Sequence, residues 1–235
     1  MITAKLKLAL ILILSFLFIF ELAADFNKGM NAYIKGDYLT AYKTWLPLAN
    51  EGYADAQSNI AGMYLSGLGV SKDTKKAFKW YSRAAKQGFV KALYILGTMY
   101  HNGEGVAPDF TEALKLYSLA ANQGDKQAQF HLGYIYAYGL QIDRDYEKGI
   151  IWATKAAKQN HIKAQLLLGN LYADDEVTNP NYLYAYVWYK LASSQSDLTA
   201  NRKITVIMNK MTNSEINTAE ELFIQCLKTN LTSCE

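Results

Sequence analysis

Apolar side chains recur at helical spacing in two successive stretches between residues 92 and 121. In the first stretch Ala92, Leu96 and Tyr100 follow one another at intervals of four, which places them on one face of a helix. In the second stretch a wider apolar face has the spacing of an amphipathic helix, and it consists of Ala113, Leu116, Tyr117, Ala120 and Ala121. A glycine-bearing loop separates the stretches, so the pattern predicts two helices joined by a short connection.

The same pattern returns every 36 residues. Three columns of this repeat are Ala56, Ala92, Ala128 and Ala164; Tyr64, Tyr100, Tyr136 and Tyr172; and Ala84, Ala120, Ala156 and Ala192. A fixed period in this range is typical of a solenoid. Since one pair of helices cannot bury enough surface to fold alone, we expect an all-α stack in which the tyrosine column fills the space between units.

Two further columns hold residues that begin and end helices. Asp73, Asp109 and Asp145 are expected N-caps, and Gly88, Gly124 and Asn160 are expected to close helices in the left-handed conformation. Glu112 stands three residues after Asp109 and is its expected capping-box partner. Local rules therefore agree with the period.

The loop motif Tyr64–Val70 and the segment Ala84–Gly88, both of which return one period later, resemble the Sel-1-like repeat, a branch of the tetratricopeptide superfamily. The resemblance implies a right-handed superhelical α/α solenoid of helical hairpins. It covers residues 54–194, with a degenerate repeat at 25–53 before it and capping helices and a tail at 195–235 after it. Pro47 is expected to kink or shorten its helix.

The N-terminus has the pattern of a secretory signal peptide over residues 1–24. Lys5 and Lys7 precede an apolar run, Leu8–Phe20, and small residues follow it. The run is too short for a permanent transmembrane helix, so we expect a periplasmic or secreted protein. Glu21 or Leu22 occupies a place where cleavage prefers a small residue, and an uncleaved membrane anchor stays the alternative.

The charge balance argues against nucleic acid and anionic lipid as partners. Loss of Lys5, Lys7 and Glu21 with the leader reduces 24 basic and 21 acidic residues to 22 and 20. Such a balance produces no strong field. A membrane contact is expected only through an uncleaved signal.

The chain has two cysteines, Cys226 and Cys234, eight residues apart at the C-terminus. In an exported protein such a pair is expected to form a disulfide. The alternative is an unpaired couple available for intermolecular bonding.

No motif for catalysis, cofactor or metal binding stands out. His101, His131 and His161 fall in three different columns, so they are not expected to converge on a metal and are interpreted as partly exposed helix or loop residues. The G-x-G pairs follow one helix and precede another by several residues, which does not fit a phosphate loop. We therefore predict a protein that is not an enzyme and has no cofactor.

The columns opposite the core face of each first helix are expected to line a concave face. They vary from unit to unit, and the candidate partner-binding residues are Tyr94, Thr98, Phe130, Tyr134, Tyr138, Leu166 and Asn170. In the first repeat the same columns hold Ser58, Gly62 and Ser66. Tyr94, Phe130, Tyr134 and Tyr138 form an aromatic strip suited to a protein or peptide partner, or else some of them pack between neighbouring helices.

By resemblance, an exported protein of this type acts as an adaptor in the bacterial envelope or in contact with host cells. A second hypothesis, also by resemblance, is an enzyme of the cell wall or of β-lactam hydrolysis. The sequence offers no nucleophile for it.

Overall fold

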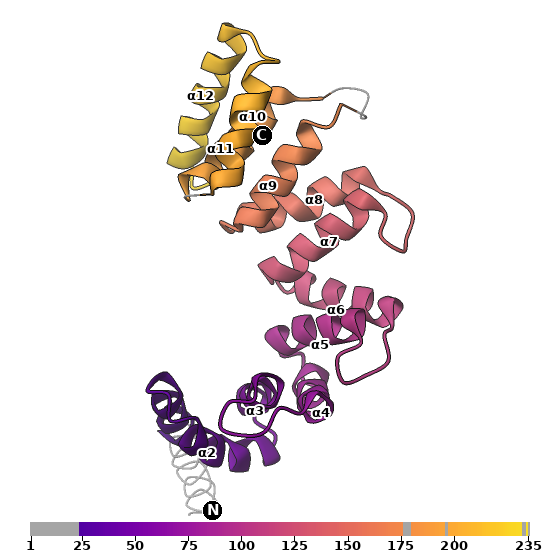
Figure 1. Cartoon of the computed structure of the whole chain (residues 1–235), viewed down its shortest axis with the longest axis vertical. Helices are drawn as coiled ribbons and strands as arrows, with labels where there is room; N and C mark the ends of the chain where they lie inside the picture. The colour runs from indigo at the N-terminus through magenta and orange to yellow at the C-terminus, as the bar shows by residue number, and fades with distance from the viewer. Residues whose placement is uncertain (1–23, 176–179, 196, 232–233, 235) are drawn as a thin grey trace, which may run out of the picture. The chain divides into compact units, whose positions relative to one another are not determined.

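The computed structural model describes residues 24–175, 180–195, 197–231 and 234. A helix over residues 24–34 comes first. The helices that follow are α2 (Tyr38–Asn50), α3 (Ala54–Ser66), α4 (Thr74–Lys86), α5 (Val90–Asn102), α6 (Phe110–Asn122), α7 (Lys126–Tyr138), α8 (Tyr146–Ala157), α9 (Ile162–Tyr172), α10 (Tyr182–Ser194), α11 (Leu198–Met208) and α12 (Asn213–Lys228) (Figure 1). The described residues contain no strand, which confirms the all-α prediction.

The predicted signal peptide lies outside the described residues except for Ala24, the first residue of the first helix. Over the part of the chain that is described, no helix combines the length and the apolar character needed to cross a bilayer.

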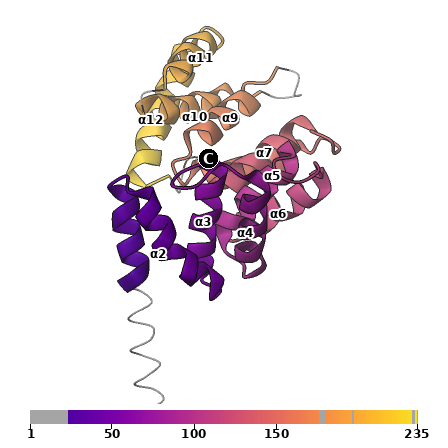
Figure 2. The same ribbon diagram turned by 60° about the horizontal axis from the view of Figure 1, so that its bottom comes forward.

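The chain divides into two compact units, the first ending at Leu116 and the second beginning at Tyr117. In the first unit α2 packs against α3, α3 against α4, and α4 against α5. In the second unit α7 packs against α8, α8 against α9, and α9 against α10, which also contacts α11 and α12 (Figure 2). Consecutive helices thus pair as hairpins, as the repeat predicts.

The predicted helix boundaries are confirmed. The Asp73, Asp109 and Asp145 carboxylates accept bonds from the backbone N–H three residues later, at 2.9, 3.0 and 2.9 Å. Gly88, Gly124 and Asn160 have φ of 78°, 92° and 59°, the left-handed region that favours glycine and, next, asparagine. The Glu112 carboxylate accepts a bond from Lys115 at 3.2 Å, and its expected capping-box bond to the Asp109 backbone stays a prediction.

The alanine columns are the tightest part of the core. The eight alanines at 56, 92, 128, 164, 84, 120, 156 and 192 are all 0% exposed. The tyrosine column is half-buried, and two of its members contact the helix before their own hairpin. Tyr64 meets Tyr42 of α2, with the hydroxyl oxygens 2.7 Å apart, and the Tyr100 ring lies 5.3 Å from that of Phe78 on α4.

A buried glutamine adds a polar link that the sequence analysis missed. Gln57, Gln129 and Gln165 are at most 5% exposed. Their amides donate to the carbonyls of Ala49, Ala121 and Ala157 at 3.0, 3.1 and 3.3 Å. They accept bonds from Gln87, Gln159 and Gln195 at 2.9, 2.8 and 2.8 Å. Each buried glutamine therefore links the end of the preceding helix to the end of the following helix. Its bonds satisfy buried polar groups.

The prediction that Pro47 shortens its helix is wrong, and the alternative, a kink, stays a prediction. Pro47 lies inside α2, which has 13 residues, as α3 does. Trp45, Leu48 and Ala49 beside it are at most 4% exposed. Burial of these side chains offsets the hydrogen bond that the proline removes.

Candidate functional site

An aromatic strip runs along one face of α7. It consists of Phe130, Tyr134 and Tyr138, four residues apart, and is called the α7 strip below. The Phe130 and Tyr134 ring centroids are 6.2 Å apart, and those of Tyr134 and Tyr138 are 4.7 Å apart. Both tyrosines are 43% exposed. The strip therefore presents ring surface to solvent on a rigid helix.

His161 supports the Phe130 end of the strip. The two rings stack with centroids 4.9 Å apart. Nδ1 of His161 accepts a bond from the Ala164 backbone N–H at 3.1 Å, and Nε2 lies 2.8 Å from Oε1 of Gln127. His161 is 7% exposed, so the prediction of a partly exposed residue is wrong for it, because it is the buried N-cap of α9.

Burial lowers the pKa of the His161 imidazole, and the nearby ammonium groups of Lys126 and Lys163 lower it further. The ring is therefore neutral at neutral pH, as its acceptor role at Nδ1 requires. The other two histidines contact aromatic rings, His131 stacking on Tyr117 at 5.2 Å and His101 meeting Phe110 at 5.5 Å.

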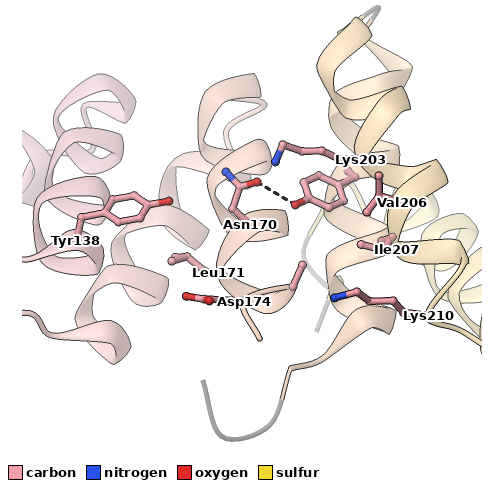
Figure 3. Close-up of a pocket in the computed structure, with 10 residues that line it drawn as sticks. Tyr138, Asn170, Leu171, Asp174, Lys203, Val206, Ile207 and Lys210 are labelled. Atoms are coloured by element: carbon pink, nitrogen blue, oxygen red, sulfur yellow. Dashed lines mark hydrogen bonds between the residues drawn. The ribbon is translucent and has the colours of Figure 1, made fainter. Parts of the chain in front are cut away.

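The other end of the strip enters a pocket of about 500 Å³ in the second unit (Figure 3). Its lining comes from α7, from α9 and the residues after it, from α10, and from α11 with Lys210 after it. These residues are Tyr138, Asn170, Leu171, Ala173, Asp174, Tyr189, Lys203, Val206, Ile207 and Lys210, and the cavity is called the α7–α11 pocket.

Two phenols and an amide form the polar wall of this pocket. Tyr189 donates a hydrogen bond to Oδ1 of Asn170 at 2.9 Å, which orients the amide (Figure 3). Burial raises the pKa of Tyr189 and, together with neighbouring Tyr134 and Asp174, that of Tyr138. Both phenols are therefore neutral at physiological pH, and Tyr189 uses its proton in the bond to Asn170.

The pocket has one positive charge without a carboxylate partner. Lys210 forms an ion pair with Asp175, and Asp174 lies 3.4 Å from Arg144. Lys203 forms no ion pair with any described residue. The pocket can therefore hold an apolar side chain while offering hydrogen-bond donors and one ammonium group.

The predicted partner-binding residues are distributed over three helices. Tyr138 and Asn170 line the same pocket. Leu166 of α9 is half-buried and packs against the core between α10 and the capping helices, so packing explains it. Tyr94 and Thr98 lie on α5 in the first unit, where the Thr98 hydroxyl donates to the Tyr94 carbonyl at 3.2 Å.

Sequence reasoning missed the contribution of the capping segment. Lys203 and Val206 lie three residues apart and share a face of α11, and Lys210 follows just after the end of that helix. This mixture of basic and apolar residues could have been recognised in the sequence as a candidate binding surface. Only packing of α11 on α10 places it opposite α7 and α9.

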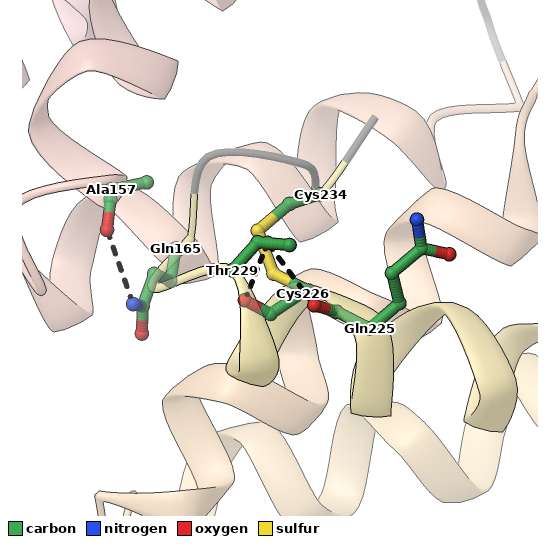
Figure 4. The surroundings of a disulfide bond; sticks show 6 residues. All are labelled: Ala157, Gln165, Gln225, Cys226, Thr229 and Cys234. Carbon is green, nitrogen blue, oxygen red and sulfur yellow. Dashed lines mark hydrogen bonds between the residues drawn. A yellow bond between two sulfur atoms is a disulfide. The ribbon is translucent and has the colours of Figure 1, made fainter.

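The two cysteines are joined in the structure (Figure 4). Their Cα atoms are 4.7 Å apart, and both residues are fully buried. They belong to a core cluster with Leu168, Trp188 and Leu231 of the second unit. The bond holds the tail against α9 and α10.

Comparison with known proteins agrees with this architecture. The family model described as Sel1 repeat matches residues 54–89, 90–125, 126–161 and 162–197. No curated protein matches the chain.

Among solved structures, a Sel1 repeat protein from Oxalobacter formigenes is 30% identical with a TM-score of 0.72, over 76% of this chain and 73% of that one. A protective antigen of uropathogenic Escherichia coli strains is 31% identical with a TM-score of 0.73, and the match covers 84% of this chain but only 44% of the antigen. An immunity protein from Pseudomonas aeruginosa is 23% identical with a TM-score of 0.53, over 92% of this chain and 84% of that one, and shares the fold.

Proposed function

The chain belongs to the Sel1 repeat family, whose members are generally protein–protein interaction scaffolds, and on that premise we propose a specific binding site for a protein partner. An extended segment of the partner lies along the α7 strip and inserts one side chain into the α7–α11 pocket. The protein acts by holding this partner and not by chemistry.

The observation that carries the proposal is the exposure of Tyr134 and Tyr138 beside a pocket. Each ring is 43% exposed on a helix, and Tyr138 also lines the cavity. Rigid aromatic side chains next to a pocket supply much contact area at little entropic cost, and they are enriched where interfaces gain most of their binding energy.

Site-directed photocrosslinking tests the site. A benzoylphenylalanine at position 134 is expected to yield one discrete crosslinked partner, whereas the same probe at Ile151, 53% exposed on α8, is expected to yield none. Tyr134→Ala with Tyr138→Ala should then weaken binding of that partner by at least about tenfold, since each ring contributes on the order of 1 kcal/mol or more. Equal crosslinking at both positions, or unchanged affinity in a folded double variant, would refute the site.

We also propose that the protein works in the periplasm or after secretion. The basic and apolar leader, the paired cysteines and the 31% identity to a protective antigen support export. N-terminal sequencing of the protein from fractionated cells should find a chain that starts near Asp25 in the periplasm or medium. A full-length chain in the membrane fraction would favour the uncleaved anchor, and a full-length chain in the cytoplasm would refute export.

The enzyme hypothesis has less support. The described residues that line the α7–α11 pocket include no serine, threonine, cysteine or histidine. Purified protein is therefore expected to show no turnover of a chromogenic β-lactam. Turnover that Tyr138→Ala abolishes would overturn the scaffold proposal.

A further inference from the structure

The first unit contains a second, smaller pocket of about 250 Å³. It is lined by Met30, Tyr33, Trp45, Ser58, Asn59, Gly62, Ser66, Tyr81 and Lys91. Ser58, Gly62 and Ser66 occupy on α3 the same repeat columns that hold Phe130, Tyr134 and Tyr138 on α7. The space exists because the first repeat has small residues in the columns where the third repeat has aromatic rings.

Two residues that line this pocket have a hydroxyl that makes no hydrogen bond among the described residues, and the Ser58 hydroxyl is buried. Ser58 is 2% exposed, and its Oγ has no partner. Tyr81 on α4 is also 2% exposed, and none of the hydrogen bonds among described residues involves its hydroxyl. A Cβ atom at Gly62 would lie 3.3 Å from that hydroxyl, so the glycine leaves space in front of it. Buried polar side-chain atoms usually have a hydrogen-bond partner, so the buried Ser58 hydroxyl points to a partner from outside the chain.

The charge of the pocket specifies the acceptor further. Lys91, at the start of α5, forms no ion pair with a described residue, and the lining includes no aspartate or glutamate. Asn59 and Ser66 add further donors. Burial raises the pKa of Tyr81 to about 12, so its hydroxyl stays protonated and donates. The lining therefore carries one positive charge, no negative charge, and hydroxyl and amide groups that can donate hydrogen bonds.

We propose that this pocket binds an aliphatic carboxylate. The carboxylate accepts bonds from Ser58 and Tyr81 and pairs with Lys91, while its short stem lies against Met30 and Tyr33. Charge-assisted bonds to a carboxylate are the strong class of hydrogen bond. The carboxylate belongs either to an acidic side chain of a polypeptide or to a small free acid. This site is independent of the α7 strip.

Titration of the full chain at constant ionic strength distinguishes the two sources. The probes are succinate, a glutamate capped as N-acetyl and N-methylamide, and the equally capped glutamine, and the readout is the indole N–H signal of Trp45 in NMR spectra. Capped glutamate binding more tightly than succinate assigns a polypeptide side chain, and the reverse assigns a free acid. Capped glutamine should bind at least about tenfold more weakly than capped glutamate, since it lacks the charge. Absence of binding by both acids, or equal binding of glutamate and glutamine, would overturn the proposal.

Variants separate binding from folding. Lys91→Gln and Tyr81→Phe should each reduce the affinity for the tighter-binding acid by about tenfold. Lys163→Gln, at the same repeat column but outside this pocket, should leave its affinity unchanged. Ser58→Ala should reduce affinity without lowering the melting temperature, because its hydroxyl has no partner to lose in the free protein.

If Ser58→Ala lowers the melting temperature and leaves affinity unchanged, the serine is structural and the assignment fails. The Tyr134→Ala and Tyr138→Ala double variant should bind the acid normally. Loss of the α7 site would therefore not be confused with loss of this one.

Discussion

The hydroxyl of Tyr189 on α10 donates a hydrogen bond to Oδ1 of Asn170 on α9, 2.9 Å away, in the wall of the α7–α11 pocket. Tyr189 is 2% exposed, so Tyr189→Phe leaves the ring packed but removes one partly buried hydrogen bond. We expect a loss of about 1 kcal/mol in the free energy of unfolding, measured with urea.

Tyr184→Phe on the same helix is the matched control, because no hydrogen bond among described residues involves that hydroxyl. Equal stability of the two variants would show that the bond to Asn170 contributes nothing. Tyr189→Phe should also weaken binding of the proposed partner, since Asn170 loses its fixed orientation.

The buried glutamine of the fourth repeat is expected to stabilise its hairpin. Gln165 is 0% exposed and bonds both the Ala157 carbonyl and the Gln195 amide. Gln165→Leu leaves both groups without this partner, at a cost of about 1 to 3 kcal/mol in urea unfolding. The same column holds Leu93, only 4% exposed, in the second repeat, so leucine fits the column. Unchanged stability would mean that the glutamine link is dispensable.

His161 should make the stability of the protein fall as the pH falls. Its folded pKa lies below the unfolded value of about 6.5, mainly because the ring is buried. The unfolded chain therefore binds the proton first, and the free energy of unfolding declines as the pH drops through about 6.5 toward the folded pKa.

In His161→Asn the cap is kept by a residue that does not titrate. Urea unfolding at several values between about pH 5 and pH 8 should give a shallower decline for this variant than for the parent. His101 and His131 are present in both proteins, so their contributions cancel in the difference. Parallel pH profiles would contradict the assigned pKa shift.

The disulfide should stabilise the capping helices. Reduction, or Cys226→Ser with Cys234→Ser, is expected to cost about 2 to 3 kcal/mol, the value for closing a loop of this length. Mass spectrometry of the purified monomer should find two hydrogens fewer than in the reduced chain. A disulfide-linked dimer on a non-reducing gel would instead support the intermolecular alternative.

Much of the fold was predictable because its signals are local or periodic. Asp145 caps the helix that follows it, and Asn160 closes one in the left-handed conformation, each through contacts within a few residues. Such rules act within a turn and can be read from sequence. Pro47 misled the prediction because burial of Trp45 and Leu48, which depends on distant residues, outweighs the local cost.

The sites could be predicted only in part. The column reasoning selected Tyr138 and Asn170, which line one pocket, but it gave Leu166 equal weight although that side chain packs against the cap. It also missed Lys203, which lies outside the repeat. No periodicity connects a capping helix to the columns that it covers.

The sequence by itself determined the hairpin, its caps and its alanine core, because residue type at a fixed spacing sets which face of a helix is buried. The tertiary structure alone decided which column residues stay exposed, where α11 closes a pocket beside Tyr138, and that the buried Ser58 hydroxyl lacks a partner. These properties depend on the side chains that other helices bring near, and so on contacts between residues distant in sequence.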